Sequence, residues 1–131
     1  MNRTQPIEYA DASVEVRAVF DDIKPQRKVG DVNNFWKYLA CDPALLKRTW
    51  ETQKAAMAPG ALDHLVKEMI YLAVSVTNGC SYGIACHTAL ARKAGMTNAM
   101  FGDLMGVIGM ANQTNRFADG FRLPVDDVFN E

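Results

Sequence analysis

The chain has 131 residues, of which 49% are hydrophobic and 22% charged, and its formal net charge is −1. This length and composition predict one ordinary globular domain over residues 1–131, with enough chain to bury a core. Lys and Arg number 14 against 15 Asp and Glu, and no basic stripe with interleaved aromatic residues occurs. Nucleic acid is therefore excluded as an expected partner.

The N-terminal stretch has no uninterrupted apolar run after basic residues, so we expect a cytoplasmic protein. The most apolar segment, residues 69–76, is far shorter than the roughly 20 residues that span a bilayer, and no membrane helix is expected. Cys41, Cys80 and Cys86 make an odd cysteine count. This count favours reduced or redox-active thiols over a framework of structural disulfides.

Apolar side chains recur at helical spacing along the chain, without the alternation typical of strands. This pattern predicts an all-α fold of about six helices. The first helix is expected over residues 12–24, with Asp11 or Ser13 as its cap and Pro25 as its end. A short helix follows within residues 32–40. Its buried side is expected to carry Phe35, Trp36 and Leu39.

Asp42 and Pro43 form a strong start signal for a helix that runs to about Met57. The next helix, residues 61–77, is apolar nearly all round beyond Met69, which is typical of a helix buried inside a protein or between subunits. The remaining elements are a helix at 80–94 that Gly95 ends, a long helix from Thr97 to about Ala118, and an irregular tail. The long helix carries glycines at 102, 106 and 109, which favour close packing.

Cys80 is the best candidate nucleophile, because the N-terminus of a helix favours a thiolate over a thiol. The alternative is a small packed residue, since cysteine is often buried. Cys80, Gly83 and His87 fall within roughly 60° of one another around a helix axis. Seven residues nevertheless correspond to about 10 Å of rise. His87 is therefore expected to reach position 83 more easily than Cys80, and position 83 has no side chain.

Cys86 and Cys80 are about 9 Å apart along a regular helix, and a disulfide needs Cα atoms within about 7 Å. The two could pair only if Cys80 lies before the first turn and the chain bends back, or if a partner subunit supplies one of them. Cys86 is therefore expected to be a packed core residue rather than a resolving thiol. Glu68 opens the most apolar part of its helix and is a candidate proton carrier; the alternative is a solvated carboxylate. His64 is expected at the surface. No metal-ligand spacing occurs, and no metal or other cofactor is implied.

The run at residues 67–96 closely resembles the core of the alkylhydroperoxidase D and carboxymuconolactone decarboxylase superfamily. The resemblance assigns about residues 61–118 to the family core, and the flanking segments resemble its peroxidase-related branch. Glu68, Cys80 and His87 match the glutamate, first cysteine and histidine of the signature, and Tyr82 matches the residue before the second cysteine. Gly83 stands where that second cysteine would be.

In the redox branch, the resemblance implies, the second cysteine attacks the substrate, the first forms a disulfide with it, and the glutamate and histidine relay protons. Our leading hypothesis is a peroxidase-like thiol oxidoreductase that works through Cys80, with Glu68 and His87 in proton transfer. The sulfenic acid on Cys80 would be reduced by Cys86, Cys41 or an external thiol.

Two alternatives stay open. The first is an acid–base lyase of the decarboxylase type, in which Glu68 and His87 act on a small organic acid or lactone. The second is a catalytically silent oligomeric protein. A helix that is apolar on every side also predicts a homo-oligomer, and the resemblance implies trimers or hexamers with the site near subunit boundaries.

Overall fold

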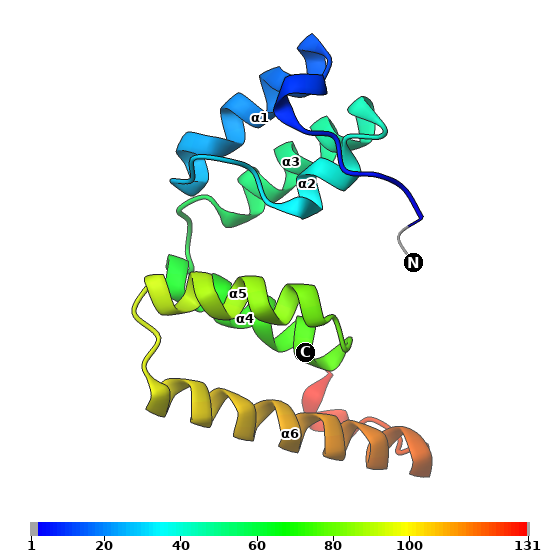
Figure 1. Ribbon diagram of the computed structural model, residues 1–131. Helices are drawn as coiled ribbons and strands as arrows, with labels where there is room; N and C mark the ends of the chain where they lie inside the picture. Colours follow the sequence, from blue (N-terminus) through cyan, green and yellow to red (C-terminus); the bar gives the residue numbers. More distant parts are fainter. Residues whose placement is uncertain (1–2, 131) are drawn as a thin grey trace. The chain divides into compact units, whose positions relative to one another are not determined.

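The computed structural model describes residues 3–130, and all its regular secondary structure there is helical (Figure 1). The all-α prediction with six α-helices is confirmed. These are α1 (Val14–Arg27), α2 (Asn34–Leu39), α3 (Pro43–Met57), α4 (His64–Thr77), α5 (Ser81–Lys93) and α6 (Asn98–Phe121). Two 3₁₀ turns, η1 (Tyr9–Asp11) and η2 (Asp127–Phe129), were not predicted. None of the described helices is long and apolar enough to cross a membrane.

The chain divides into two compact units, the first ending at Ala58 and the second beginning at Pro59. The first unit contains α1, α2 and α3, and the second contains α4, α5 and α6. Each unit has its own cluster of buried apolar side chains. The candidate site residues, apart from Cys41, all belong to the second unit.

In the first unit, α1 packs against α3, and both contact the core around Trp36 and Trp50, whose rings meet edge to face at 5.4 Å. Asp22 accepts hydrogen bonds from Lys54 Nζ and from Trp50 Nε1, each at 2.7 Å. The bond from Lys54, followed by that from Trp50, lowers the pKa of Asp22. The core residues of this unit are Ala12, Val16, Val19, Phe20, Ile23, Val32, Trp36, Ala40, Leu46 and Trp50.

Two details of the first unit differ from the sequence prediction. Pro25 does not end the first helix but lies inside α1, which continues to Arg27. The last turn is held by the N–H groups of Lys28 and Val29, which both donate to the carbonyl of Lys24, with Lys28 in the left-handed conformation at φ 54°. Phe35 is 45% exposed rather than buried, because α2 presents the neighbouring Trp36 to the core instead.

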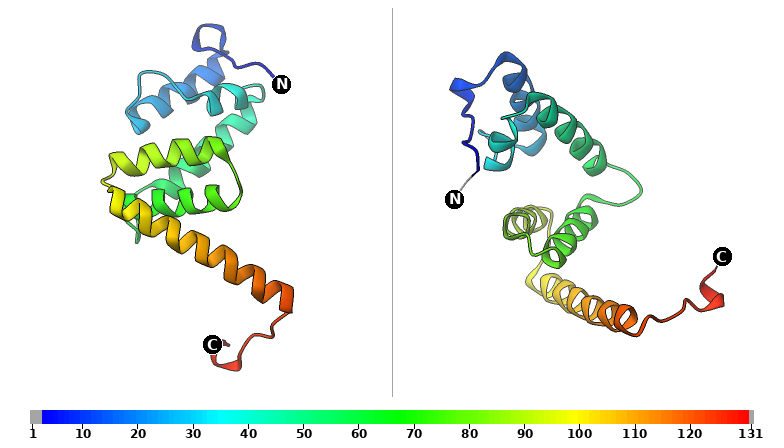
Figure 2. Two further views of the ribbon diagram at one scale, coloured as in Figure 1. Left: turned by 60° about the horizontal axis from the view of Figure 1, so that its bottom comes forward. Right: turned by 90° about the vertical axis from the view of Figure 1, so that its right-hand side faces the viewer.

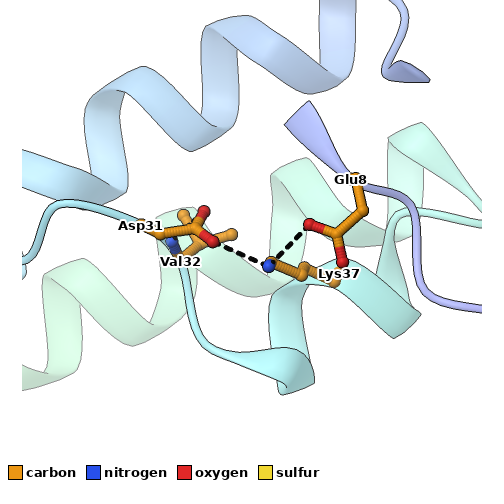
Figure 3. A network of polar contacts seen from close by, with 4 residues as sticks. All are labelled: Glu8, Asp31, Val32 and Lys37. Atoms are coloured by element: carbon orange, nitrogen blue, oxygen red, sulfur yellow. Dashed lines mark hydrogen bonds and ion pairs between the residues drawn. The ribbon is translucent and has the colours of Figure 1, made fainter. Parts of the chain in front are cut away.

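Lys37 is buried and holds the segment before α1 against α2 (Figure 3). Its ammonium donates to Asp31 Oδ2 at 2.7 Å and to Glu8 Oε2 at 2.8 Å. The Lys37 carbonyl also accepts the N–H of Ile7 at 3.0 Å. The hydrogen bonds to Asp31 and then to Glu8 raise the pKa of Lys37, and the same ammonium lowers the pKa of Asp31. This network stabilises the first unit rather than forming a reactive site.

In the second unit, α4 and α5 lie side by side as an antiparallel pair joined by a short turn, and α6 packs on α4 (Figures 1 and 2). Asp63 and Thr97 cap α4 and α6 by accepting N–H bonds from the first helical turns. Gly95 has the expected positive φ, 108°. The buried core contains Leu72, Ala91 and Met96, surrounded by half-buried apolar side chains of all three helices. The α4–α5 pair carries the site.

Candidate active site

Cys80 lies at the end of the turn that joins α4 to α5. Gly79 has φ 66° and reverses the chain direction, a conformation that glycine adopts without strain. The Cys80 N–H then donates to the Ser75 carbonyl at 3.0 Å. Cys80 is the N-cap of α5, so it lies just before the first helical turn.

The Cys80 sulfur is exposed and accepts a hydrogen bond from the Gly83 N–H at 3.3 Å. It therefore takes the place that a serine or aspartate oxygen has in an ordinary N-cap. The N–H donor and the positive end of the α5 dipole both favour negative charge on this sulfur. Solvent access and a fixed orientation are the properties that a nucleophilic thiol requires.

Glu68 and His87 form a buried pair that joins α4 to α5. His87 Nδ1 lies 2.7 Å from Glu68 Oε2, and both residues are buried. A solvated Glu68 is thus ruled out. Removing a carboxylate from water costs several kcal/mol unless a partner satisfies it, and the imidazole is that partner. The Tyr71 ring stacks on the His87 ring with centroids 3.7 Å apart and fixes its orientation.

The space beside Gly83, a position without a side chain, is partly occupied by a neighbouring residue. A Cβ atom at position 83 would lie 2.6 Å from Ser75 Oγ, 3.1 Å from Ser75 Cβ and 3.3 Å from Cys80 Sγ. Real Cβ contacts are essentially never shorter than 3.0 Å. The buried Ser75 hydroxyl therefore partly fills the place of the missing side chain, and it lies on the same side of Gly83 as the Cys80 sulfur.

The remaining cysteines and Tyr82 differ in their exposure to solvent. Cys86 is half-buried, Tyr82 is 46% exposed, and Cys41 is exposed and belongs to the first unit. None of the three cysteines is joined in a disulfide. Across the residues that the structure describes, no group of three or more His, Cys, Asp or Glu side chains is arranged to hold a metal ion.

The contributions of His64, Tyr71 and Ser75 were missed, although their spacing contains a signal. With Glu68 they stand at positions i, i+4, i+7 and i+11 of α4, which places all four within about 60° around the helix axis. A row of polar and aromatic groups on one side of an otherwise apolar helix indicates a site. That this row faces α5 becomes known only from the packing of the two helices.

Comparisons with known proteins identify the family of this chain. The model of the carboxymuconolactone decarboxylase family matches residues 43–126, and the chain belongs to that family. The chain is also similar to the crystal structure of an alkylhydroperoxidase AhpD core from Rhodospirillum rubrum. The two share 49% sequence identity and a TM-score of 0.95, over 100% of this chain and 98% of that one. Among curated proteins no similar sequence was found.

Proposed function

We propose that this chain is a thiol oxidoreductase that reduces hydroperoxides through Cys80. The observation that carries the proposal is the buried, hydrogen-bonded pair of Glu68 on α4 and His87 on α5, together with an exposed Cys80 at the N-cap of α5. The similarity to an alkylhydroperoxidase AhpD core supports the same class of reaction. A buried imidazole held by a carboxylate is suited to accept and return a proton near neutral pH.

In the proposed reaction the Cys80 thiolate attacks one oxygen of the hydroperoxide and the O–O bond breaks. The sulfur gives up two electrons and becomes a sulfenic acid, while the other oxygen leaves as an alcohol. His87, held by Glu68, takes the thiol proton and returns it to the leaving oxygen. About 10 Å of helix rise separates Cys80 from His87, so the proton passes through water or the bound substrate.

We propose that the second half of the cycle uses an external thiol. Position 83 carries no thiol, and the Ser75 hydroxyl partly fills its place. An external low-molecular-weight thiol attacks the sulfenic acid on Cys80, which releases water and leaves a mixed disulfide. A second thiol molecule then restores the Cys80 thiol and departs as the oxidised disulfide. Cys86 and Cys41 are not needed in this cycle.

The test is oxidation of the reduced protein by cumene hydroperoxide, followed by mass spectrometry and by trapping of sulfenic acid. We expect one added oxygen on Cys80, and none in Cys80→Ser. Cys86→Ser and Cys41→Ser serve as matched controls and should keep the wild-type rate. His87→Gln should lower the oxidation rate by about 100-fold or more, the usual size of a general acid–base contribution. Oxidation of Cys80 no faster than that of a small free thiol would reject the proposal.

The second candidate is an acid–base lyase that acts on a small organic acid or lactone. The specific observation in its favour is that the Glu68–His87 pair is complete without any cysteine, and the name of the matching family points to decarboxylation. A lyase would keep its turnover in Cys80→Ser and lose it in His87→Gln. A catalytically silent protein would show neither activity.

We further propose that the chain works as a homo-oligomer, a trimer or a hexamer. Along α4, Val66, Ile70 and Val74 are all exposed, with 53% exposure at Val74. On α6 an apolar hollow is lined by Gly102, Asp103, Gly106, Val107, Met110 and Ala111. Exposed apolar surfaces of this kind are typical of subunit contacts. Light scattering should give a multiple of 14.5 kDa, and Ile70→Lys should shift the mass towards the monomer; a monomeric wild type would contradict the proposal.

A further inference from the structure

The buried carboxylate of Glu68 faces two imidazoles, one on each of its oxygens. Oε2 lies 2.7 Å from His87 Nδ1, and Oε1 lies 3.8 Å from His64 Nε2. The Glu68 side chain is only 4% exposed, whereas the His64 side chain is 60% exposed. Glu68 therefore lies between the buried imidazole and an imidazole in contact with solvent.

The charged and titratable groups beside Glu68 come from α4 and α5. His64 is the first residue of α4, and the preceding Asp63 carboxylate accepts the N–H of Val66 at 2.9 Å as the helix cap. On α5 the group that faces Glu68 is His87, covered by the Tyr71 ring. In the part of the chain that the structure describes, the ion pairs recorded for Glu68 are those to His64 and His87.

We propose that His64 exchanges protons between solvent and the Glu68–His87 pair. It acts on the reaction through that pair, and in this sense it is a positioning residue and not a catalytic one. This inference rests on the proposed hydroperoxide reduction. The external thiol attacks as a thiolate, so its proton goes to solvent, and a proton must be supplied where the Cys80 sulfenic acid releases water. A pair buried as deeply as Glu68 and His87 needs an exposed group beside it to regain protons, and imidazole exchanges protons near neutral pH.

The distance of 3.8 Å between His64 Nε2 and Glu68 Oε1 is longer than a hydrogen bond. His64 therefore has to move by about 1 Å to reach bonding distance. An exposed side chain changes rotamer within picoseconds to nanoseconds, so this movement does not limit turnover. Contact with Glu68 in one rotamer and with water in another is what proton exchange requires.

The first test compares wild type, His64→Gln and the control Lys93→Gln in steady-state reduction of cumene hydroperoxide with dithiothreitol. Lys93 is an exposed residue in the last turn of α5 and is not one of the ion-pair partners of Glu68. We expect His64→Gln to lower kcat by about two- to fivefold, the effect typical of an exposed ion pair, and Lys93→Gln to change nothing. Added imidazole should restore the rate of His64→Gln, which a merely structural loss would not allow.

The second test needs no activity. The chain has two histidines, so each imidazole signal in an NMR spectrum is assigned by one substitution. At one fixed pH, His64→Gln should shift the His87 ring signals and Lys93→Gln should not, because a change beside Oε1 of Glu68 is felt at Oε2. Unchanged His87 signals in His64→Gln, or full turnover in that variant, would overturn the inference. Unoxidised Cys80 in wild type, with His87 signals that do shift in His64→Gln, would instead reject the proposed function and keep the coupling.

Discussion

The contact between Ser75 and Gly83 can be tested by a double-mutant cycle on stability. The perturbation is Gly83→Ala, made once in wild type and once in Ser75→Ala. In wild type the new methyl group would lie 2.6 Å from Ser75 Oγ, so the hydroxyl has to rotate away. In Ser75→Ala that oxygen is absent, and the nearest atom of residue 75 is its Cβ at 3.1 Å.

The magnitudes follow from two opposing effects. Replacing glycine by alanine inside a helix stabilises it by about 1 kcal/mol, while forcing a methyl group into a packed site costs about 1–3 kcal/mol. The lower end of that cost applies here, because the closest atom is the end of a short side chain that can turn. We therefore expect Gly83→Ala to be close to neutral in wild type and stabilising by about 1 kcal/mol in Ser75→Ala.

The assay is urea unfolding of all four proteins at one protein concentration, because oligomers gain apparent stability with concentration. An equal effect of Gly83→Ala in both backgrounds, within about 0.3 kcal/mol, would refute the contact. The same cycle guides restoration of the missing thiol. Gly83→Cys should form a disulfide with Cys80 more readily in Ser75→Ala than in wild type, as measured by loss of titratable thiols after oxidation.

Three further predictions concern stability. The hydrogen bond from Lys37 lowers the pKa of Asp31. The stability that this pair contributes is therefore present above about pH 4, the usual range of an aspartate, and is lost as the pH falls through the pKa of Asp31 in the folded protein. The urea midpoint of Asp31→Asn should accordingly depend less on acid pH than that of wild type. Lys28→Gly should raise the free energy of unfolding by about 1 kcal/mol, because Lys28 has φ 54°; a lower urea midpoint would contradict this. His87→Phe should destabilise the protein by about 3–5 kcal/mol, since it leaves the buried Glu68 without its partner, and Glu68→Leu in the same protein should recover part of the loss in a thermal scan.

The limits of the sequence prediction are clearest at the helix ends. Asp42, Pro43 and Thr97 act through backbone groups within a few residues, so local sequence was enough to find the starts of α3 and α6. The prediction that Pro25 ends the first helix was wrong. A proline near the end of a helix removes one N–H donor, but the N–H of Lys28 can still bond to the last turn. The effect of a single helix breaker depends on what the following residues can still bond.

Within the site, spacing could predict which residues share a face of one helix but not what lies opposite. Glu68 and His87 come from different helices, and their 2.7 Å contact depends on how α4 and α5 pack. The same is true of the contact between Ser75 and Gly83, because no local pattern connects these two positions. The absence of a side chain at position 83 therefore does not leave a vacant space, because Ser75 of the neighbouring helix partly fills it.

The energetics of α4 support the proposal that its row of polar groups serves a reaction and not packing alone. The helix could bury more apolar surface if Glu68 and Ser75 were apolar, because a buried ion pair is often replaced by hydrophobic residues without loss of stability. Instead the buried carboxylate is held by His87 and approached by His64. Most of the other α4 residues are apolar, so these groups are not there for solubility. An apolar Glu68→Leu, His87→Phe protein should therefore stay folded and oligomeric while it loses hydroperoxide reduction, and loss of folding in that variant would show that the pair serves the structure first.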